Sequence, residues 1–253
     1  MQDQVEGLHQ CMDPYRPLIL TVRLGGPTRY ETNQLVNEYN FGGRGPVNTV
    51  LLASGAGYAD ALSLGPVAAG INNGHTGMPL ILTQGGATLG GTATTQLSDF
   101  NPTNIVIAGG TAVISQSVED SLVADGYHVL RLAGADRTLT AAAIAGWATA
   151  GVVPRTGIEA SQGYSTQRAY ITTGSNFADA VAAGPVAAAN DNIILLSNSP
   201  TDLGLGIPSY LGPKAVGFDD GQVSQLWALG MTLATSNSLM KEAAASIGTA
   251  LTP

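Results

Sequence analysis

One phrase occurs twice in the chain. It reads Arg-Leu-Gly-Gly-Pro-Thr-Arg-Tyr-Glu-Thr at Arg23–Thr32 and Arg-Leu-Ala-Gly-Ala-Asp-Arg-Thr-Leu-Thr at Arg131–Thr140. A second phrase, built around Ala-Asp-Ala and Gly-Pro-Val-Ala-Ala, occurs at Ser54–Ala69 and again at Thr173–Ala188. The copies are 108 positions apart for the first phrase and 119 for the second, which predicts an insertion in the second copy, within 151–167. A repeat of this length is a small domain and not a solenoid unit.

The order of elements within each copy predicts the fold class. Short apolar runs bounded by Gly and Pro, such as 47–53, are typical of buried strands, and they alternate with segments of helical spacing. This alternation predicts an α/β fold in which mainly parallel sheets are flanked by helices. We therefore expect an N-terminal arm at 1–20 and two tandem, similar domains at 21–130 and 131–253.

The expected elements have the following bounds. In the first copy, helices are expected at 28–39, 60–69, 92–100 and 115–125, and strands at 47–53, 79–83, 104–108 and 128–132. In the second copy, helices are expected at 139–149, 179–189 and from about 223 onward, a helical turn at 207–211, and strands at 168–173, 193–196 and 214–218.

Composition narrows the classes of partner. Charged residues make up 11% of the 253 residues, against about 25% in an average protein, and the net charge is −8. So few cations argue against nucleic acid as a partner, because phosphate binding needs a basic face. An anionic ligand would instead be held locally by a few arginines. The low charge is also more typical of secreted or particle-bound proteins than of cytosolic enzymes.

Other features exclude further classes. The single cysteine, Cys11, excludes an intramolecular disulfide framework. The apolar runs are too short to cross a bilayer, so we expect no membrane insertion. Three scattered histidines (His9, His75 and His128) and the lack of paired cysteines argue against a metal site. No dinucleotide fingerprint, phosphate loop or nucleophile elbow is present, so we expect no cofactor and no enzymatic activity.

The arginines of the repeated phrase are the main candidates for chemistry. They are Arg23, Arg29, Arg131 and Arg137. The planar guanidinium suits carboxylate or phosphate, so these residues could form a ligand clamp. They could equally form internal ion pairs with Asp60 and Asp179, which recur with them. The sequence leaves both interpretations open.

Two further candidates follow strands. Asp60 and Asp179 stand where helices begin, so we expect each to be an N-cap or an arginine partner, and neither has a histidine or second carboxylate in its motif. The stretch 109–111, Gly-Gly-Thr, could form a backbone nest for an anion, although a tight turn is the simpler interpretation.

Taken together, these motifs give the chain a family resemblance. The opening phrase, a G-x-x-x-A-D-A-L-x-x-x-P centre, an apolar strand at 79–82 and a strand-turn at 105–111 occur in order. In this pattern the chain resembles the type 2 cell-wall-binding repeat of Gram-positive surface and S-layer-associated proteins. The second copy departs from the pattern: its opening lacks the tyrosine, and 216–220 reads Val-Gly-Phe-Asp-Asp where Gly-Gly-Thr is expected.

The resemblance implies non-covalent attachment to an anionic secondary polymer of the cell wall. It links anchoring with an apolar strand and with basic residues near the domain junctions. Carried over to this chain, these are Leu80, Ile81, Leu82, Ile194, Leu195 and Leu196, with Arg29 and Arg137 as the basic residues. The residues themselves also allow the apolar strands to be sheet core.

The sequence analysis thus predicts a non-catalytic module that binds cell-wall polymer at the cell surface. The alternative is a phage virion protein, a decoration or tail component, that uses the same fold for assembly and host adhesion. The family commonly has three repeats, and this chain has two, so we also expect apolar surface to remain for a homo-oligomer. The C-terminal helix or the N-terminal arm is the expected contact.

Overall fold

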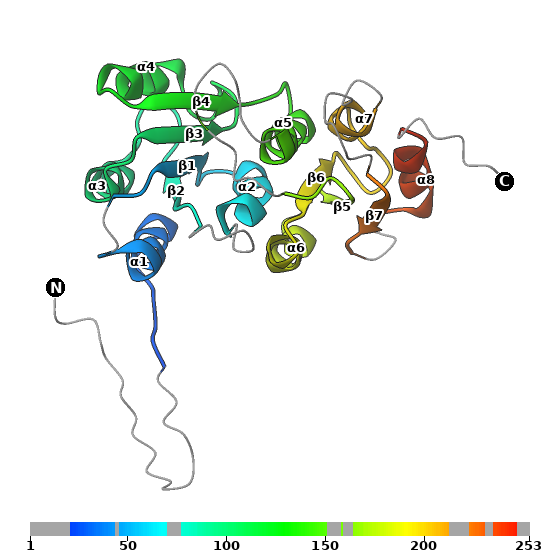
Figure 1. The fold of residues 1–253 in the computed structure, drawn as a ribbon, viewed down its shortest axis with the longest axis horizontal. Coiled ribbons are helices and arrows are strands. Elements are labelled where there is room, and N and C mark those ends of the chain that lie inside the picture. The colour runs from blue at the N-terminus through cyan, green and yellow to red at the C-terminus, as the bar shows by residue number, and fades with distance from the viewer. Residues whose placement is uncertain are drawn as a thin grey trace, which may run out of the picture.

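Two parallel sheets form the framework of the chain (Figure 1). The computed structural model describes residues 21–43, 46–69, 77–150, 158, 164–212, 223–230 and 235–246. Within these residues, sheet one has the strand order β2-β1-β3-β4 and sheet two the order β6-β5-β7, and every pair of neighbouring strands is parallel. The predicted α/β class with two similar units is confirmed.

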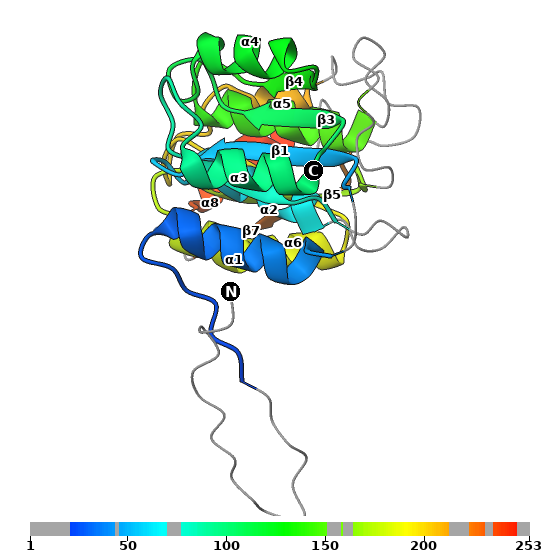
Figure 2. The ribbon, with the colours of Figure 1, turned by 90° about the vertical axis from the view of Figure 1, so that its left-hand side faces the viewer.

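Sheet one and its helices come from the first copy. The strands are β1 (Thr49–Ser54), β2 (Leu80–Thr83), β3 (Asn104–Ala108) and β4 (His128–Leu132). The helices are α1 (Arg29–Phe41), α2 (Ala59–Ala69), α3 (Gly91–Phe100) and α4 (Gln116–Ala124). Both faces of the sheet are buried, because alternate residues of β1 and β3 enter two separate clusters. Helices α3 and α4 cover one face, visible together in Figure 2.

Sheet two and its helices come from the second copy. The strands are β5 (Arg168–Thr173), β6 (Ile193–Ser197) and β7 (Gln225–Ala228). The helices are α5 (Arg137–Ala150), α6 (Ala178–Ala189), α7 (Gly206–Leu211) and α8 (Asn237–Ala245). Helix α6 packs on one face through Ala183 and Ala187, while α7 and α8 pack on the other.

The two copies share one core. Helices α2 and α5 lie between the sheets in Figure 1. Leu64 of α2 and Ile144 of α5 belong to one continuous cluster with Leu51 of sheet one and Leu195 of sheet two. Helix α5 therefore opens the second copy in sequence but also covers the inner face of sheet one. This interlocking makes the junction a packed interior and not a linker.

Corresponding strands occupy corresponding places. β5 is central as β1 is, β6 takes the place of β2, and β7 takes the place of β3. One prediction was wrong here: β7 at Gln225–Ala228 lies in a span predicted to be helical from residue 223. Its short apolar segment pairs with β5, and the final helix begins only at Asn237, after the N-cap Ser236. The predicted strand at 214–218, the arm at 1–20 and most of the 151–167 insertion lie outside the described residues.

Candidate functional site

The repeated opening phrase is a device for starting a helix. In the first copy, Thr28 caps α1 and forms a capping box with Glu31. In the second copy, Asp136 takes the place of Thr28, and its Oδ1 accepts from the backbone N–H of Thr138 at 2.8 Å and of Leu139 at 3.0 Å. Burial alone would raise the pKa of Asp136, but the Thr138 hydroxyl, these N–H groups and the charge of Arg137 lower it. The phrase thus encodes the same helix start twice.

The fourth residue of the phrase, Gly26 in the first copy and Gly134 in the second, packs closely against the helix that follows. The backbone N–H of Gly26 donates to Thr32 Oγ1 at 3.0 Å, and that of Gly134 donates to Thr140 Oγ1 at 3.1 Å. A Cβ on Gly134 would lie 2.2 Å from the Cβ of Leu139. Any larger residue would therefore push the helix away from the preceding strand.

Three of the four candidate arginines bind glycine carbonyls at the ends of strands. Arg29 Nη1 donates to the carbonyl of Gly55, after β1, at 2.7 Å, and Arg137 Nη1 donates to that of Gly174, after β5. Arg131 Nη1 donates to the carbonyl of Gly109, after β3, at 2.8 Å. These bonds tie the start of each helix, and strand β4, to the carboxyl edge of a sheet.

The predicted ion pairs take a different form. Arg131 pairs with Glu119 of α4, Nε to Oε2 at 2.6 Å, and the two side chains are 12% and 20% exposed. For Arg29 and Arg137 the partners seen within the described ranges are carbonyl oxygens and not the carboxylates of Asp60 or Asp179. Arg23 is exposed and has no hydrogen bond or ion pair within the described part of the chain.

Asp60 is half-buried at the junction and does not cap a helix. It is the second residue of α2, as Asp179 is of α6, and the N-cap position of α6 belongs to Phe177. Burial raises the pKa of Asp60, and the positive charge of Arg137 from the other copy acts in the opposite direction. The turn after β3 lies against it, since a Cβ on Gly109, where φ is +106°, would be 2.6 Å from Asp60 Oδ2.

An aromatic pair joins the two copies at the same edge. Tyr58 and Phe177 occupy the same position of the second repeated phrase, and their rings are 5.8 Å apart. The Tyr58 hydroxyl also donates to the carbonyl of Gly174 at 3.3 Å. Both rings are partly exposed. Sequence reasoning did not single out this pair, although an aromatic residue at one position of both copies was a usable signal.

The apolar strands are part of the sheets. Ile81 in β2 and Ile194, Leu195 and Leu196 in β6 are buried, which agrees with the interpretation as sheet core. Leu80 and Leu82 are half-buried at the edge of sheet one. There Asn33 of α1 donates from Nδ2 to the Leu80 carbonyl at 2.8 Å and accepts at Oδ1 from the Leu82 N–H at 3.0 Å.

The remaining features considered from the sequence are the 109–111 stretch, a metal site and a membrane-spanning helix. The 109–111 stretch forms a tight turn, in which the Val113 and Ile114 N–H groups donate to the carbonyl of Gly110. No cluster of three His, Cys, Asp or Glu residues suited to a metal ion occurs in the part of the chain that is described. None of the described helices is both long and apolar enough to cross a bilayer.

Comparison with known proteins identifies relatives that match most of this chain. The chain is 34% identical over 197 residues to the amidase enhancer of Bacillus subtilis (strain 168), a match that covers 78% of this chain and 24% of that protein. It is 29% identical over 194 residues to the N-acetylmuramoyl-L-alanine amidase LytC of the same organism, with 77% of this chain and 34% of that protein covered. The chain thus spans only a quarter to a third of these relatives.

Solved structures share the fold. Cwp6 from Clostridium difficile superposes with a TM-score of 0.67 at 19% identity, over 88% of this chain and 31% of that chain. Cwp8 from the same organism superposes with a TM-score of 0.64 at 24% identity, over 90% of this chain and 33% of that chain. The family model described as "Cell wall binding domain 2 (CWB2)" matches residues 23–119 and 131–240, which correspond to the two copies. The chain therefore belongs to the cell wall binding domain 2 family.

Proposed function

We propose that this chain attaches non-covalently to a polymer of the bacterial cell wall and acts at the cell surface. The match of the family model to both copies carries this proposal. The fold supports it, because each copy keeps the phrases that start its helices and tie them to a sheet. The family match also favours wall binding over the virion alternative.

We further propose that the chain has no catalytic activity. Asp60 is the carboxylate that most resembles a catalytic group, because burial raises its pKa. Its surroundings in the described residues are the turn at Gly109 and the charge of Arg137, with no histidine beside it. A raised pKa alone does not identify a catalytic acid, since buried structural groups shift in the same way.

Three arginines are the proposed contacts for an anionic polymer. Arg23, Arg29 and Arg137 are exposed. Arg29 and Arg137 each use one guanidinium N–H group to bind a glycine carbonyl, and their other guanidinium N–H groups remain for a ligand. Arg131 is less suitable because Glu119 and Gly109 already occupy it. The apolar strands would act indirectly, by supporting the sheets.

Self-association is also proposed, through the surface where α2 and α6 meet. A groove of ≈ 510 Å³ lies between these helices and is lined by apolar and small residues. Equivalent positions of the second phrase face it from both sides, among them Leu62 with Val181 and Gly65 with Gly184. The occupant proposed is a second copy of this chain, because two helices of similar sequence, α2 and α6, already pack against each other there. The contact was expected at the C-terminal helix or the N-terminal arm. We propose the groove instead, because Leu239 and Ala243 of α8 pack in the core and the arm at 1–20 lies outside the described residues.

A sedimentation assay tests wall binding. The chain should sediment with purified walls of Gram-positive bacteria and stay in solution when the secondary polymers have been stripped from those walls. A triple variant, Arg23→Gln, Arg29→Gln and Arg137→Gln, should bind more weakly and lose the sensitivity to salt of the wild-type protein. Equal sedimentation with intact and stripped walls would contradict the proposal.

Light scattering of the wild-type protein and of the Val181→Glu variant tests self-association through the groove between α2 and α6. A monomeric wild-type protein would contradict self-association.

A further inference from the structure

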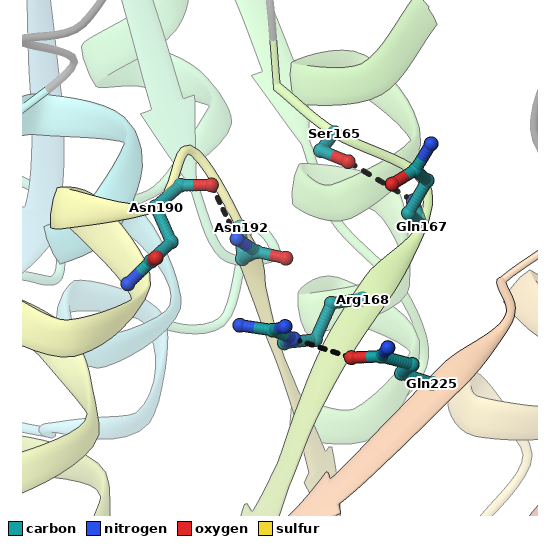
Figure 3. A pocket seen from close by; sticks show the side chains of 6 residues that line it. All are labelled: Ser165, Gln167, Arg168, Asn190, Asn192 and Gln225. Atoms are coloured by element: carbon teal, nitrogen blue, oxygen red, sulfur yellow. Dashed lines mark hydrogen bonds between the residues drawn. The ribbon is translucent and has the colours of Figure 1, made fainter.

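A row of polar side chains crosses sheet two at its amino-terminal edge. Arg168 of β5 is paired with Gln225 of β7, and Asn192, just before β6, lies on the other side of Arg168 in the same register. These three residues line a pocket of ≈ 200 Å³ together with Ser165, Gln167 and Asn190. Figure 3 shows Arg168 and Asn192 among the residues that line this pocket, with Arg168 bonded to Gln225 and Asn192 bonded to Asn190. The pocket lies at the opposite edge of the sheet from the glycine carbonyls that the phrase arginines bind.

The pocket has unused hydrogen-bonding capacity of both kinds. Asn192 is only 4% exposed; its Nδ2 donates to the Asn190 carbonyl, while its Oδ1 has no partner among the described residues. Arg168 Nε donates to Gln225 Oε1 at 2.9 Å, and no carboxylate in the described ranges pairs with the guanidinium. A buried acceptor without a donor costs free energy, and a guanidinium without an anion keeps its preference for one.

An aromatic ring fixes the guanidinium in place. The Cζ of Arg168 lies 4.3 Å from the centre of the Trp227 ring, which is 46% exposed and packs edge-on against Tyr170. The stacking and the bond to Gln225 orient the two Nη groups before any ligand arrives. An exposed apolar ring beside amides and a cation suits a ligand with apolar and polar faces, as a sugar has.

The first copy shows that the fold does not need this row. At the same register in sheet one stand Met78, Thr49 and Asn104, and Met78 packs against the core. Val106 takes the place of Trp227 and is 0% exposed. The sheet therefore forms without an arginine in this row, and the cation and the orphan acceptor are particular to the second copy.

We propose that this pocket binds one acidic saccharide unit, and the proposal rests on the wall-polymer function above. The carboxylate or phosphate of the sugar accepts hydrogen bonds from the Arg168 Nη groups. A hydroxyl or acetamido N–H of the same unit donates to Asn192 Oδ1. The exposed part of the Trp227 ring lies against C–H groups of the sugar. The pocket is smaller than the roughly 300 Å³ at which sites for drug-sized ligands begin, which fits a single unit.

Tryptophan signals of the full chain report on the pocket. The chain has two tryptophans, and Trp147 is buried, so changes in fluorescence and in one of two indole N–H resonances identify Trp227. The probes are glucuronic acid, glucose 6-phosphate, N-acetylglucosamine and inorganic phosphate. We expect one or both acidic sugars to shift the Trp227 signals; a response to only one would distinguish carboxylate from phosphate. The neutral sugar lacks the anion for Arg168 and should bind at least about tenfold more weakly, the loss expected from one charge-assisted hydrogen bond. Inorganic phosphate keeps the anion but lacks the sugar C–H groups that would lie against Trp227, and it should also bind at least about tenfold more weakly.

Variants separate recognition from folding. Arg168→Gln should weaken binding of the acidic sugar by at least about tenfold. Asn192→Leu should weaken it similarly while keeping or raising the melting temperature, because an apolar group replaces an unpaired buried acceptor. Lys241→Gln, the same loss of charge on the exposed side of α8, is the matched control and should bind normally.

The outcomes distinguish this inference from the proposed function. If no acidic sugar binds, or inorganic phosphate binds as tightly as the sugars, the pocket proposal is wrong even when the chain still sediments with walls. If the sugars bind and the variants weaken them while the chain fails to sediment with walls, the pocket proposal stands and wall attachment fails.

Discussion

The two copies of the opening phrase form the same local structure in different surroundings. In the second copy, Arg131 is enclosed by Glu119 and by the carbonyls of Gly109 and Ser115. In the first copy the equivalent residue, Arg23, is exposed. The phrase sets the start of a helix by itself, whereas the partners of its first arginine, seen at Arg131, come from α4 and from the loops beside it in the first copy.

The helices that follow the phrase differ in the same way. Helix α5 lies between the sheets, and its buried positions include Ala141 and Ala145. The equivalent positions of α1 are Asn33 and Asn37, which bind the edge strand β2 and, for Asn37, also Gln96 of α3. Small residues allow close packing inside the molecule, whereas amides satisfy backbone groups at its border.

The largest expected difference is between the two first arginines of the phrase. Arg131→Met leaves Glu119 partly buried without its cation and should lower the free energy of unfolding by about 2–3 kcal/mol. Arg23→Met should change it by less than about 0.5 kcal/mol, because the side chain is exposed. Urea unfolding of both variants measures this. Equal losses would mean that the copies do not differ as described.

A smaller effect on stability is expected at α1, the helix that lies against the edge strand β2. Asn33→Ala removes one of the two amide donors to the Leu80 carbonyl, leaving that of Asn37, and removes the acceptor for the Leu82 N–H, so it should lower the free energy of unfolding by about 1–2 kcal/mol. Asn40→Ala is the matched control, since it makes the same gain in helix propensity on the exposed side of α1. Thermal unfolding and amide exchange at Leu82 measure the effect. Fast exchange at Leu82 in the wild-type protein would contradict the role of Asn33.

The smallest effect concerns the pH dependence of stability. Because the pKa of Asp60 is raised, the folded protein binds this proton more tightly than the unfolded chain does. The contribution of Asp60 to the free energy of unfolding therefore falls as the pH rises from the ordinary aspartate range through the raised pKa. In Asp60→Asn this decrease should be absent, so the variant gains relative to wild type toward neutral pH.

Urea unfolding from below the ordinary aspartate pKa of about 3.9 up to neutral pH measures this change, because the step begins in the ordinary range and ends above it. Asp179→Asn, the same substitution in the second copy, should leave the pH-dependent step of Asp60 in place. A pH profile of Asp60→Asn that follows the wild-type profile would show that Asp60 is not the group responsible.

The sequence predicted most of the fold because the signals were local. Buried runs such as 104–108 and caps such as Ser115 act within a few residues, and the structure places them as expected. The error at Gln225–Ala228 has a physical reason: this strand is defined by pairing with β5, nearly sixty positions earlier, and its own four residues give little pattern.

The candidate site was less predictable because its contacts are long-range. The partners of Arg29 and Arg137 are carbonyl groups, which carry no sequence signal, so the carboxylates of Asp60 and Asp179 looked like better partners. The row of Asn192, Arg168 and Gln225 depends on the register of three strands. No spacing along the chain brings these residues together before the sheet is formed.

Asn33, at the edge of sheet one, has a further consequence when many copies of the protein are crowded together. An edge strand exposes backbone groups that can pair with a strand of another molecule and begin aggregation. With one donor and one acceptor, the Asn33 amide makes at β2 the two bonds that an incoming strand would make. Molecules held at high density on a polymer surface would thus meet at this border without joining their sheets.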